Sequence, residues 1–400
     1  MSAAVSAPRE SADAARERKG SAGPAKITLA EVFTAHWPAY EKEHGARIPH
    51  AHRKAARAIL ACRTELRGVV RSVCGSCGER TIAPLSCGHR ACPQCGTAAA
   101  SAWRERSAAK LLPVPHFLVT FTVPEQLRAL LRAHPEAGYA ALFAAHASAL
   151  GSTIRDKLGG GGGWTSVLHT WTRELIFHPH IHSIVAGLVL TGDGLPRRVA
   201  KSDYLVPHAL LARRWRDDLR ARLCAVRTPG GAFENALATI PADTWRRKWV
   251  VDLQPVGSGE KAMSYLARYV QKTALDHARI VAADGHGVTI GWRDRESKKP
   301  RSATLGGAEF LRRFLQHVLP GGFMRIRHGG FYAPAASARY RRLCAFLAHE
   351  NKPAEPWTPT CAKCGGRIFI TSIRVGRRTI IPRATIEHFG VGHLLEERPP

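Results

Sequence analysis

Residues 177–185 read Phe-His-Pro-His-Ile-His-Ser-Ile-Val and place three histidines at every second position of an apolar run. Alternate residues of a β-strand point to the same face, so this spacing predicts that His178, His180 and His182 project together from a buried sheet. The apolar neighbours favour a central strand that carries a metal-binding pair, His180 and His182. Histidines that are hydrogen-bonded within a core or a cleft would give the same pattern.

The chain is strongly basic. Its 400 residues include 59 Lys and Arg against 31 Asp and Glu, which gives a net charge of +28 and a pI near 10.5. This balance is unusual for an enzyme of small metabolites and predicts a polyanionic partner such as nucleic acid. Arginine dominates the basic clusters, which suits forked contacts to phosphate.

The composition also indicates the surroundings in which the protein works. No apolar run approaches the roughly 18 residues of a membrane span, and the N-terminus lacks an apolar signal core. The ten cysteines fall mostly into C-x2-C pairs rather than a disulfide framework. We therefore expect a soluble protein of a reducing compartment, cytoplasmic and associated with the nucleoid, with no membrane partner.

The hydrophobic fraction of 45% is enough for two or three domains. Hydrophobic periodicity predicts helices over residues 27–66, 135–157, 204–226 and 262–275. It predicts strands over residues 117–123, 164–171, 175–185, 249–253, 288–293 and 302–305. We expect a flexible basic arm (1–25), a helical lead-in with a zinc-binding DNA-docking domain (26–110), a catalytic domain with a basic extension (111–345), and a C-terminal segment with a cysteine pair (346–400).

A cysteine cluster lies in the second of these segments. Ten cysteines placed at random would give about 0.25 C-x2-C pairs, whereas the chain has three. Fourteen residues separate the pair Cys74 and Cys77 from the pair Cys92 and Cys95. This spacing predicts two knuckles that share one tetrahedral Zn²⁺ through four thiolates, with a role in folding and DNA docking rather than in chemistry.

Other cysteines leave the number of zinc ions open. Cys62 precedes the first knuckle, and Cys87 and His89 precede the second. These residues allow a second zinc or the exchange of one ligand. Cys361 and Cys364 form a third C-x2-C pair without an obvious second pair, and a separate zinc there is one interpretation of it.

A pair of tyrosines provides candidate nucleophiles. Tyr265 and Tyr269 are four positions apart, which places both phenols on one face of the predicted helix; two core aromatic residues would give the same spacing. A tyrosine can attack a DNA phosphate if the charge on the phosphoryl oxygens is neutralised, and a divalent ion held by His180 and His182 would do this. A covalent phosphotyrosine would conserve the energy of the broken bond, and the chain has no nucleotide-binding glycine loop in a suitable context.

Several motifs together resemble one known family, the rolling-circle insertion-sequence transposases of the two-tyrosine HUH nuclease class with an N-terminal zinc-binding domain. The resemblance spans about residues 50–370. The matching motifs are Ala61-Cys62-Arg63 with the cysteine cluster, residues 121–125 (FTVPE), 168–171 (LHTW), 178–182 (HPHIH), 265–269 (YLARY) and 325–329 (RIRHG).

The resemblance implies an α+β fold of the HUH type. An antiparallel five-stranded palm with flanking helices would carry the histidines on its central strand and follow a small zinc-binding domain. The tyrosine helix would pack across the palm. His180 and His182 would be the metal-binding pair. His169 is the first choice for a third ligand and Glu174 the second.

The resemblance also implies a reaction. The protein would nick single-stranded DNA at a transposon end, form a 5′-phosphotyrosine and a free 3′-hydroxyl, and transfer the strand to target DNA with Mg²⁺ or Mn²⁺. Tyr265 and Tyr269 would be the nucleophiles, although relatives with one tyrosine leave open whether both act. Arg268 would hold the scissile phosphate or face solvent. The expected DNA-binding residues are Arg325, Arg327, His328, Lys298 and Lys299.

Two other functions stay open at this stage. A plasmid replication initiator or a conjugative relaxase would share the HUH chemistry. A zinc-containing DNA-binding protein without catalysis would need the histidines and tyrosines only as core residues.

Overall fold

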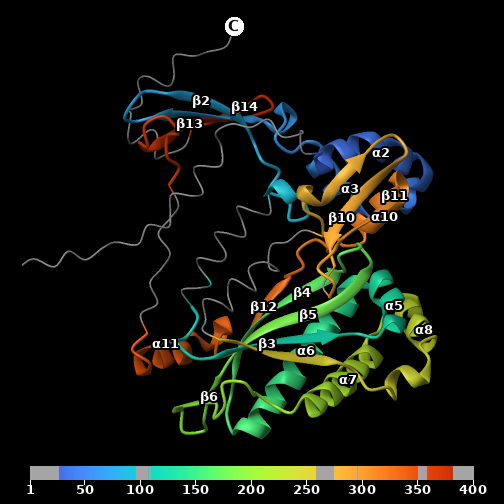
Figure 1. Cartoon of the computed structure of the whole chain (residues 1–400), viewed down its shortest axis with the longest axis vertical. Coiled ribbons are helices and arrows are strands. Elements are labelled where there is room, and N and C mark those ends of the chain that lie inside the picture. The colour runs from blue at the N-terminus through green and yellow to red at the C-terminus, as the bar shows by residue number, and fades with distance from the viewer. Residues whose placement is uncertain are drawn as a thin grey trace, which may run out of the picture.

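The centre of the molecule is a five-stranded antiparallel sheet (Figure 1). The computed structural model describes residues 27–95, 107, 110–257, 274–294, 296–349 and 358–381. The sheet has the order β12-β4-β5-β3-β8. Its strands are β3 (His116–Thr122), β4 (Gly163–Trp171), β5 (Phe177–Ala186), β8 (Val251–Gly257) and β12 (Ile326–Gly330). The predicted five-stranded sheet with the histidine strand β5 at its centre is confirmed.

Helices cover one face of this sheet. They are α5 (Arg128–Ala133), α6 (Pro135–Leu158), α7 (His208–Ala225) and α8 (Ala232–Ala238). Alternate residues of the strands, including Phe121 and Ile181, are fully buried in the same core as Trp215 of α7. The Trp215 indole donates a hydrogen bond to the Thr122 carbonyl at 3.0 Å. This packing leaves His180 and His182, which flank Ile181, on the opposite face of the sheet.

A second core joins the N-terminal helices to a later part of the chain. Helices α2 (Leu29–His44) and α3 (His50–Leu60) pack with a three-stranded sheet and helix α10 (Gly307–Leu315). The rings of Phe33 in α2 and Phe314 in α10 meet edge to face at 5.6 Å. Helix α2 begins in a capping box formed by Thr28 and Glu31. The three strands are β9 (Ile280–Ala283), β10 (Gly287–Arg293) and β11 (Pro300–Gly306).

A four-stranded sheet combines two strands that follow α3 with the last two strands of the described chain. Its order is β14-β13-β1-β2, with β1 (Val69–Cys74), β2 (Arg80–Pro84), β13 (Ile368–Val375) and β14 (Arg378–Ile380). Strand β13 pairs directly with β1, so Cys74 lies opposite Ile368. This pairing was not predicted, because the two strands lie in segments that we expected to be separate.

The remaining elements are short or peripheral. They are β6 (Leu188–Leu190), β7 (Pro196–Arg198), α11 (Ser337–Phe346) and the 3-10 helices η1 (Gly45–Arg47), η2 (Glu65–Arg67), η3 (Glu125–Leu127), η4 (Pro229–Gly231), η5 (Ala242–Trp245), η6 (His277–Arg279) and η7 (Pro334–Ala336). Among the helices that the structure describes, none combines the length and the apolar character needed to cross a membrane.

Candidate functional site

Three histidines converge on the face of the five-stranded sheet that lies opposite α6 and α7. His180 and His182 belong to β5, and His169 of β4 is paired with His180 across the two strands. One ring nitrogen from each of the three lies within 4.8 Å of the others. His169 and His182 are buried and His180 is partly buried. The alternation of the strands therefore produces a three-imidazole cluster that is able to hold a metal ion.

The hydrogen bonds of the cluster orient its imidazoles. His180 Nδ1 donates to the His178 carbonyl at 2.7 Å, so Nε2 of His180 carries the lone pair. His182 Nδ1 lies 3.0 Å from the Thr120 hydroxyl on β3. Burial lowers the pKa of His180 to about 4, which keeps the ring neutral at pH 7. A neutral imidazole is the form that coordinates a metal.

Two neighbours complete the surroundings of the cluster. The Trp171 ring stacks on His169 at 4.8 Å. Arg128 of α5 donates from Nη2 to Nδ1 of His178 at 2.8 Å. Burial and the charge of Arg128 lower the pKa of His178, so that ring is also neutral. His178 is not among the three clustered residues, and its carbonyl orients His180 instead.

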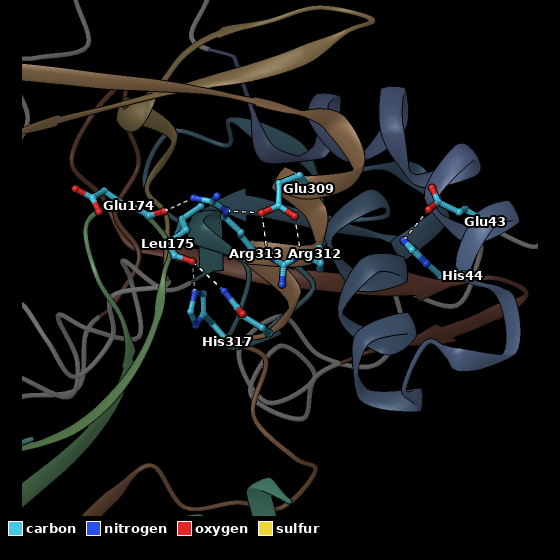
Figure 2. A network of polar contacts seen from close by, with 9 residues as sticks. Glu43, His44, Glu174, Leu175, Glu309, Arg312, Arg313 and His317 are labelled. Carbon is cyan, nitrogen blue, oxygen red and sulfur yellow. Dashed lines mark hydrogen bonds and ion pairs between the residues drawn. The ribbon is translucent and has the colours of Figure 1, made fainter. Parts of the chain in front are cut away.

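The turn between β4 and β5 is fixed by α10 and the residues that follow it (Figure 2). Gln316 and His317 donate to the Leu175 carbonyl at 2.9 and 3.2 Å, and Arg313 donates to the Glu174 carbonyl at 3.5 Å. Leu175 has a positive φ of 58° and a fully buried side chain. The Glu174 side chain is exposed and does not join the histidine cluster, so the geometry favours His169 over Glu174 as third ligand.

A basic cleft of about 380 Å³ lies beside the histidine strand. Its lining includes Arg128, which contacts His178, and Arg132 one turn further along α5. Arg312 and Arg313 line it too, and both bind the Glu309 carboxylate (Figure 2). Four arginines line the cleft, one acidic residue, Glu125, lines it with them, and Glu309 pairs with two of the arginines. The cleft keeps an excess of positive charge, which suits a nucleic-acid backbone.

The predicted DNA-binding residues on β12 point in different directions. Arg327 lies over the Phe143 ring at 4.3 Å, on the α6 side of the sheet. His328 lies on the histidine face, where its Nδ1 is 2.9 Å from the Thr165 hydroxyl. Of these two residues, only His328 shares the face of the histidine cluster.

The other predicted DNA-binding residues are also apart from one another. Arg325 lies over the Trp171 ring at 5.7 Å, and burial together with the charge of Arg90 lowers its pKa to about 10. Lys298 and Lys299 occupy the exposed turn between β10 and β11. Contact of each with DNA remains a prediction.

The tyrosine prediction concerns a segment that the structure does not describe. Tyr265, Arg268 and Tyr269 lie within residues 258–273, outside the described residues. This segment follows β8 directly in the chain.

The cysteines correct one prediction. They form two groups of four within the part of the chain that is described, Cys62, Cys87, Cys92 and Cys95 in one and Cys74, Cys77, Cys361 and Cys364 in the other. The prediction that the pairs Cys74/Cys77 and Cys92/Cys95 share one zinc is therefore wrong. The β1–β2 hairpin holds the first pair beside β13, whereas the second pair lies beside the end of α3.

The first group has the dimensions of a zinc site. The sulfur atom of Cys62 lies 3.6 Å from those of Cys92 and Cys95, and those of Cys87 and Cys95 are 3.5 Å apart. A tetrahedron with Zn–S bonds of about 2.3 Å has edges of about 3.8 Å. Hydrogen bonding from Cys92 and from the His89 amide lowers the pKa of Cys87, which favours the thiolate. These four residues fit one structural zinc.

Sequence reasoning missed several residues of the site. Thr120 and Arg128 gave no signal, because each acts through a contact between elements that are distant in the chain. Cys361 and Cys364 were recognisable as a C-x2-C pair, but the spacing of the cysteines did not identify the residues that lie opposite this pair.

Comparisons with known proteins match both parts of the chain. Residues 163–340 match a family model described as "Putative transposase", and residues 32–123 match one described as "Transposase zinc-binding domain". The "Putative transposase y4qJ" of Sinorhizobium fredii is 34% identical over 82% of this chain and 85% of its own length. The "Transposase for insertion sequence element IS801" of Pseudomonas savastanoi pv. phaseolicola is 28% identical over 78% of each chain. No solved structure matches significantly.

These matches confirm the family that the motifs predicted, and they support Zn²⁺ as a ligand of the N-terminal domain. The histidine cluster lies within the first matched range and one complete cysteine group within the second. The chain belongs to the insertion-sequence transposases of the IS91 and IS801 family.

Proposed function

We propose that this transposase nicks single-stranded DNA at the ends of its element through a 5′-phosphotyrosine intermediate and then transfers the strand to target DNA. The observation that carries the proposal is the convergence of His169, His180 and His182, with ligand nitrogens within 4.8 Å of one another. Family membership supports DNA as the substrate. Tyr265 and Tyr269 are the proposed nucleophiles on the basis of the sequence motif, and Arg268 is the proposed phosphate contact.

The protein residues have separate tasks in this mechanism. The three imidazoles would hold a divalent ion, which would supply Lewis-acid stabilisation of the negative charge on the scissile phosphate. Thr120 and the His178 carbonyl keep the coordinating rings in place. The arginines of the basic cleft, Arg128 and Arg132 foremost, bind the backbone of the single strand next to the ion.

The ligands of the cluster also favour particular ions. Imidazole suits transition metals, whereas Mg²⁺ prefers oxygen ligands and water. Of the two ions that HUH nucleases are expected to use, we propose that Mn²⁺ binds this cluster more tightly than Mg²⁺. The zinc of the first cysteine group has a structural role. The proposed location of the reaction is the cytoplasm.

A covalent-adduct assay tests the proposal. The purified protein is incubated with Mn²⁺ and single-stranded DNA from the ends of its own element, and the products are separated on a denaturing gel. We expect a protein–DNA adduct that His180→Ala abolishes and that Tyr265→Phe or Tyr269→Phe reduces.

Matched control variants distinguish the loss of a site residue from a general loss of folding. His286 is exposed in the β9–β10 turn and Tyr204 is about half exposed, so His286→Ala and Tyr204→Phe should leave the adduct unchanged. An adduct that persists when both Tyr265 and Tyr269 are replaced by Phe would refute the proposed nucleophiles. Salt-sensitive DNA binding with no adduct from the wild type would instead favour a DNA-binding protein without catalysis.

A further inference from the structure

The second cysteine group joins two parts of the chain that are 290 positions apart. The sulfur atoms of Cys74 and Cys364 are 3.5 Å apart, and those of Cys77 and Cys361 are 3.8 Å apart. The edges of a Zn–S4 tetrahedron measure about 3.8 Å, whereas a disulfide bond measures about 2.0 Å. All four ligand atoms lie within 4.8 Å of one another. The distances fit a metal ion between four thiolates and do not fit disulfide bonds.

The two cysteine loops have the same backbone structure. The amide of Gly78 donates to the Cys74 carbonyl at 3.0 Å, and the amide of Gly365 donates to the Cys361 carbonyl at 2.8 Å. In both loops the first cysteine amide donates to the carbonyl five positions later, at 2.9 and 2.7 Å. Both glycines have the positive φ that this turn requires, 69° and 74°. Two segments with no other common feature than C-x2-C-G thus form the same knuckle.

The knuckles face each other where β1 meets β13. A Cβ atom on Gly366 would lie 3.1 Å from the Cys74 sulfur and 2.4 Å from the Ser76 hydroxyl oxygen, so only glycine permits this approach. Lys363 of one knuckle forms an ion pair with Glu79 of the other at 3.1 Å. Side chains of both knuckles therefore form the contact between them, and the four cysteine sulfur atoms lie within this contact.

We propose that Cys74, Cys77, Cys361 and Cys364 bind a second structural zinc ion, which attaches residues 358–381 to the N-terminal zinc domain. Cys361 and Cys364 lie outside both ranges that match the family models. The zinc-binding unit of this protein is thus made from both ends of the chain. This inference is independent of the proposed nuclease mechanism.

The metal content of the full-length protein tests the inference. The protein is purified under reducing conditions and its zinc is measured by mass spectrometry against protein concentration. The measurement uses a His180→Ala background, so that the histidine cluster does not add a zinc ion to the count. We expect two zinc ions per chain in this background, and one when Cys361→Ser and Cys364→Ser are added. Cys224 is exposed on α7 and belongs to neither group, so Cys224→Ser should keep both ions.

Further measurements apply even if the cysteine variant does not fold. X-ray absorption at the zinc edge of the His180→Ala protein should show sulfur as the only ligand type, and titration of the metal-free protein with Co²⁺ should give two equivalents with tetrahedral thiolate spectra. Peptide mapping without reduction should find no link between Cys74 and Cys364. One zinc per chain in the His180→Ala protein, two when both cysteine substitutions are added to it, or a disulfide between the knuckles in the reduced preparation would each overturn the inference.

Discussion

Replacing Thr120 by Val tests whether the histidine cluster is a metal site with an oriented imidazole. The Thr120 hydroxyl is 3.0 Å from Nδ1 of His182, and Val keeps the shape of the side chain while it removes this partner. Loss of such a partner typically costs 10- to 100-fold in metal affinity, which corresponds to about 1.4 to 2.7 kcal/mol. We therefore expect the Kd for Mn²⁺ to rise about 10- to 100-fold with little change in the fold.

Calorimetric titration with Mn²⁺ measures this Kd on protein that holds zinc in its cysteine groups and no metal at the histidine cluster. Thr122→Val is the matched control. Thr122 lies two positions along the same strand, and its hydroxyl donates to the Val250 carbonyl at 3.1 Å rather than to a histidine. The control should keep the wild-type Kd. An unchanged Kd in Thr120→Val, or an equal rise in both variants, would refute the argument that this hydroxyl orients a ligand.

Three other predictions concern stability, DNA binding and ion preference. Burial lowers the pKa of His116 to about 4 and those of His146 and His317 to about 3. Below the unfolded pKa of about 6.5, the unfolded chain therefore binds more protons than the folded chain. Each of these histidines should remove about 1.4 kcal/mol of stability per pH unit as the pH falls from about 6.5 towards 4. Urea midpoints at pH 7 and pH 5 measure this loss, which His146→Gln should reduce, and equal midpoints would contradict it. Arg132→Ala should weaken single-stranded DNA binding and lower the log–log salt slope by about 0.7, whereas Arg222→Ala, exposed on α7, should do neither. Mn²⁺ should support adduct formation at lower concentration than Mg²⁺, and the reverse order in a metal titration would count against a three-imidazole site.

The parts of the fold that follow from local pattern were predictable from the sequence. Period-two alternation identified β5 and the face of its histidines, and the spacing of the β4–β5 hairpin brought His169 opposite His180. Helix α6 and the β10–β11 hairpin also lie where hydrophobic periodicity placed them. In these cases the residues that determine the structure are neighbours in the chain, so a short window contains the necessary information.

The pairing of the cysteines was not predictable for the opposite reason. A C-x2-C pair supplies half of a zinc site, and any two such pairs are chemically equivalent ligands. Three pairs and the single residues Cys62 and Cys87 permit several sets of four. The entropy of loop closure rises only slowly with loop length, so it does not strongly favour the partner that is nearer in sequence. The pairing of strand β1 with strand β13 determines which cysteine pairs meet, and no local sequence pattern reveals this strand pairing.

The same dependence on distant segments extends to the histidine strand. Leu175, in the turn that precedes β5, adopts a left-handed conformation that costs roughly 1 to 2 kcal/mol for a residue with a side chain. Its fully buried side chain lies in the core that α2 and α10 share, and its carbonyl accepts hydrogen bonds from Gln316 and His317. These contacts offset the strain and fix the turn, because without them nothing would compensate the cost of the left-handed conformation at a leucine. The register that brings His180 opposite His169 is therefore held partly by the N-terminal helices. The position of the histidine cluster thus depends on a core that lies outside the five-stranded sheet.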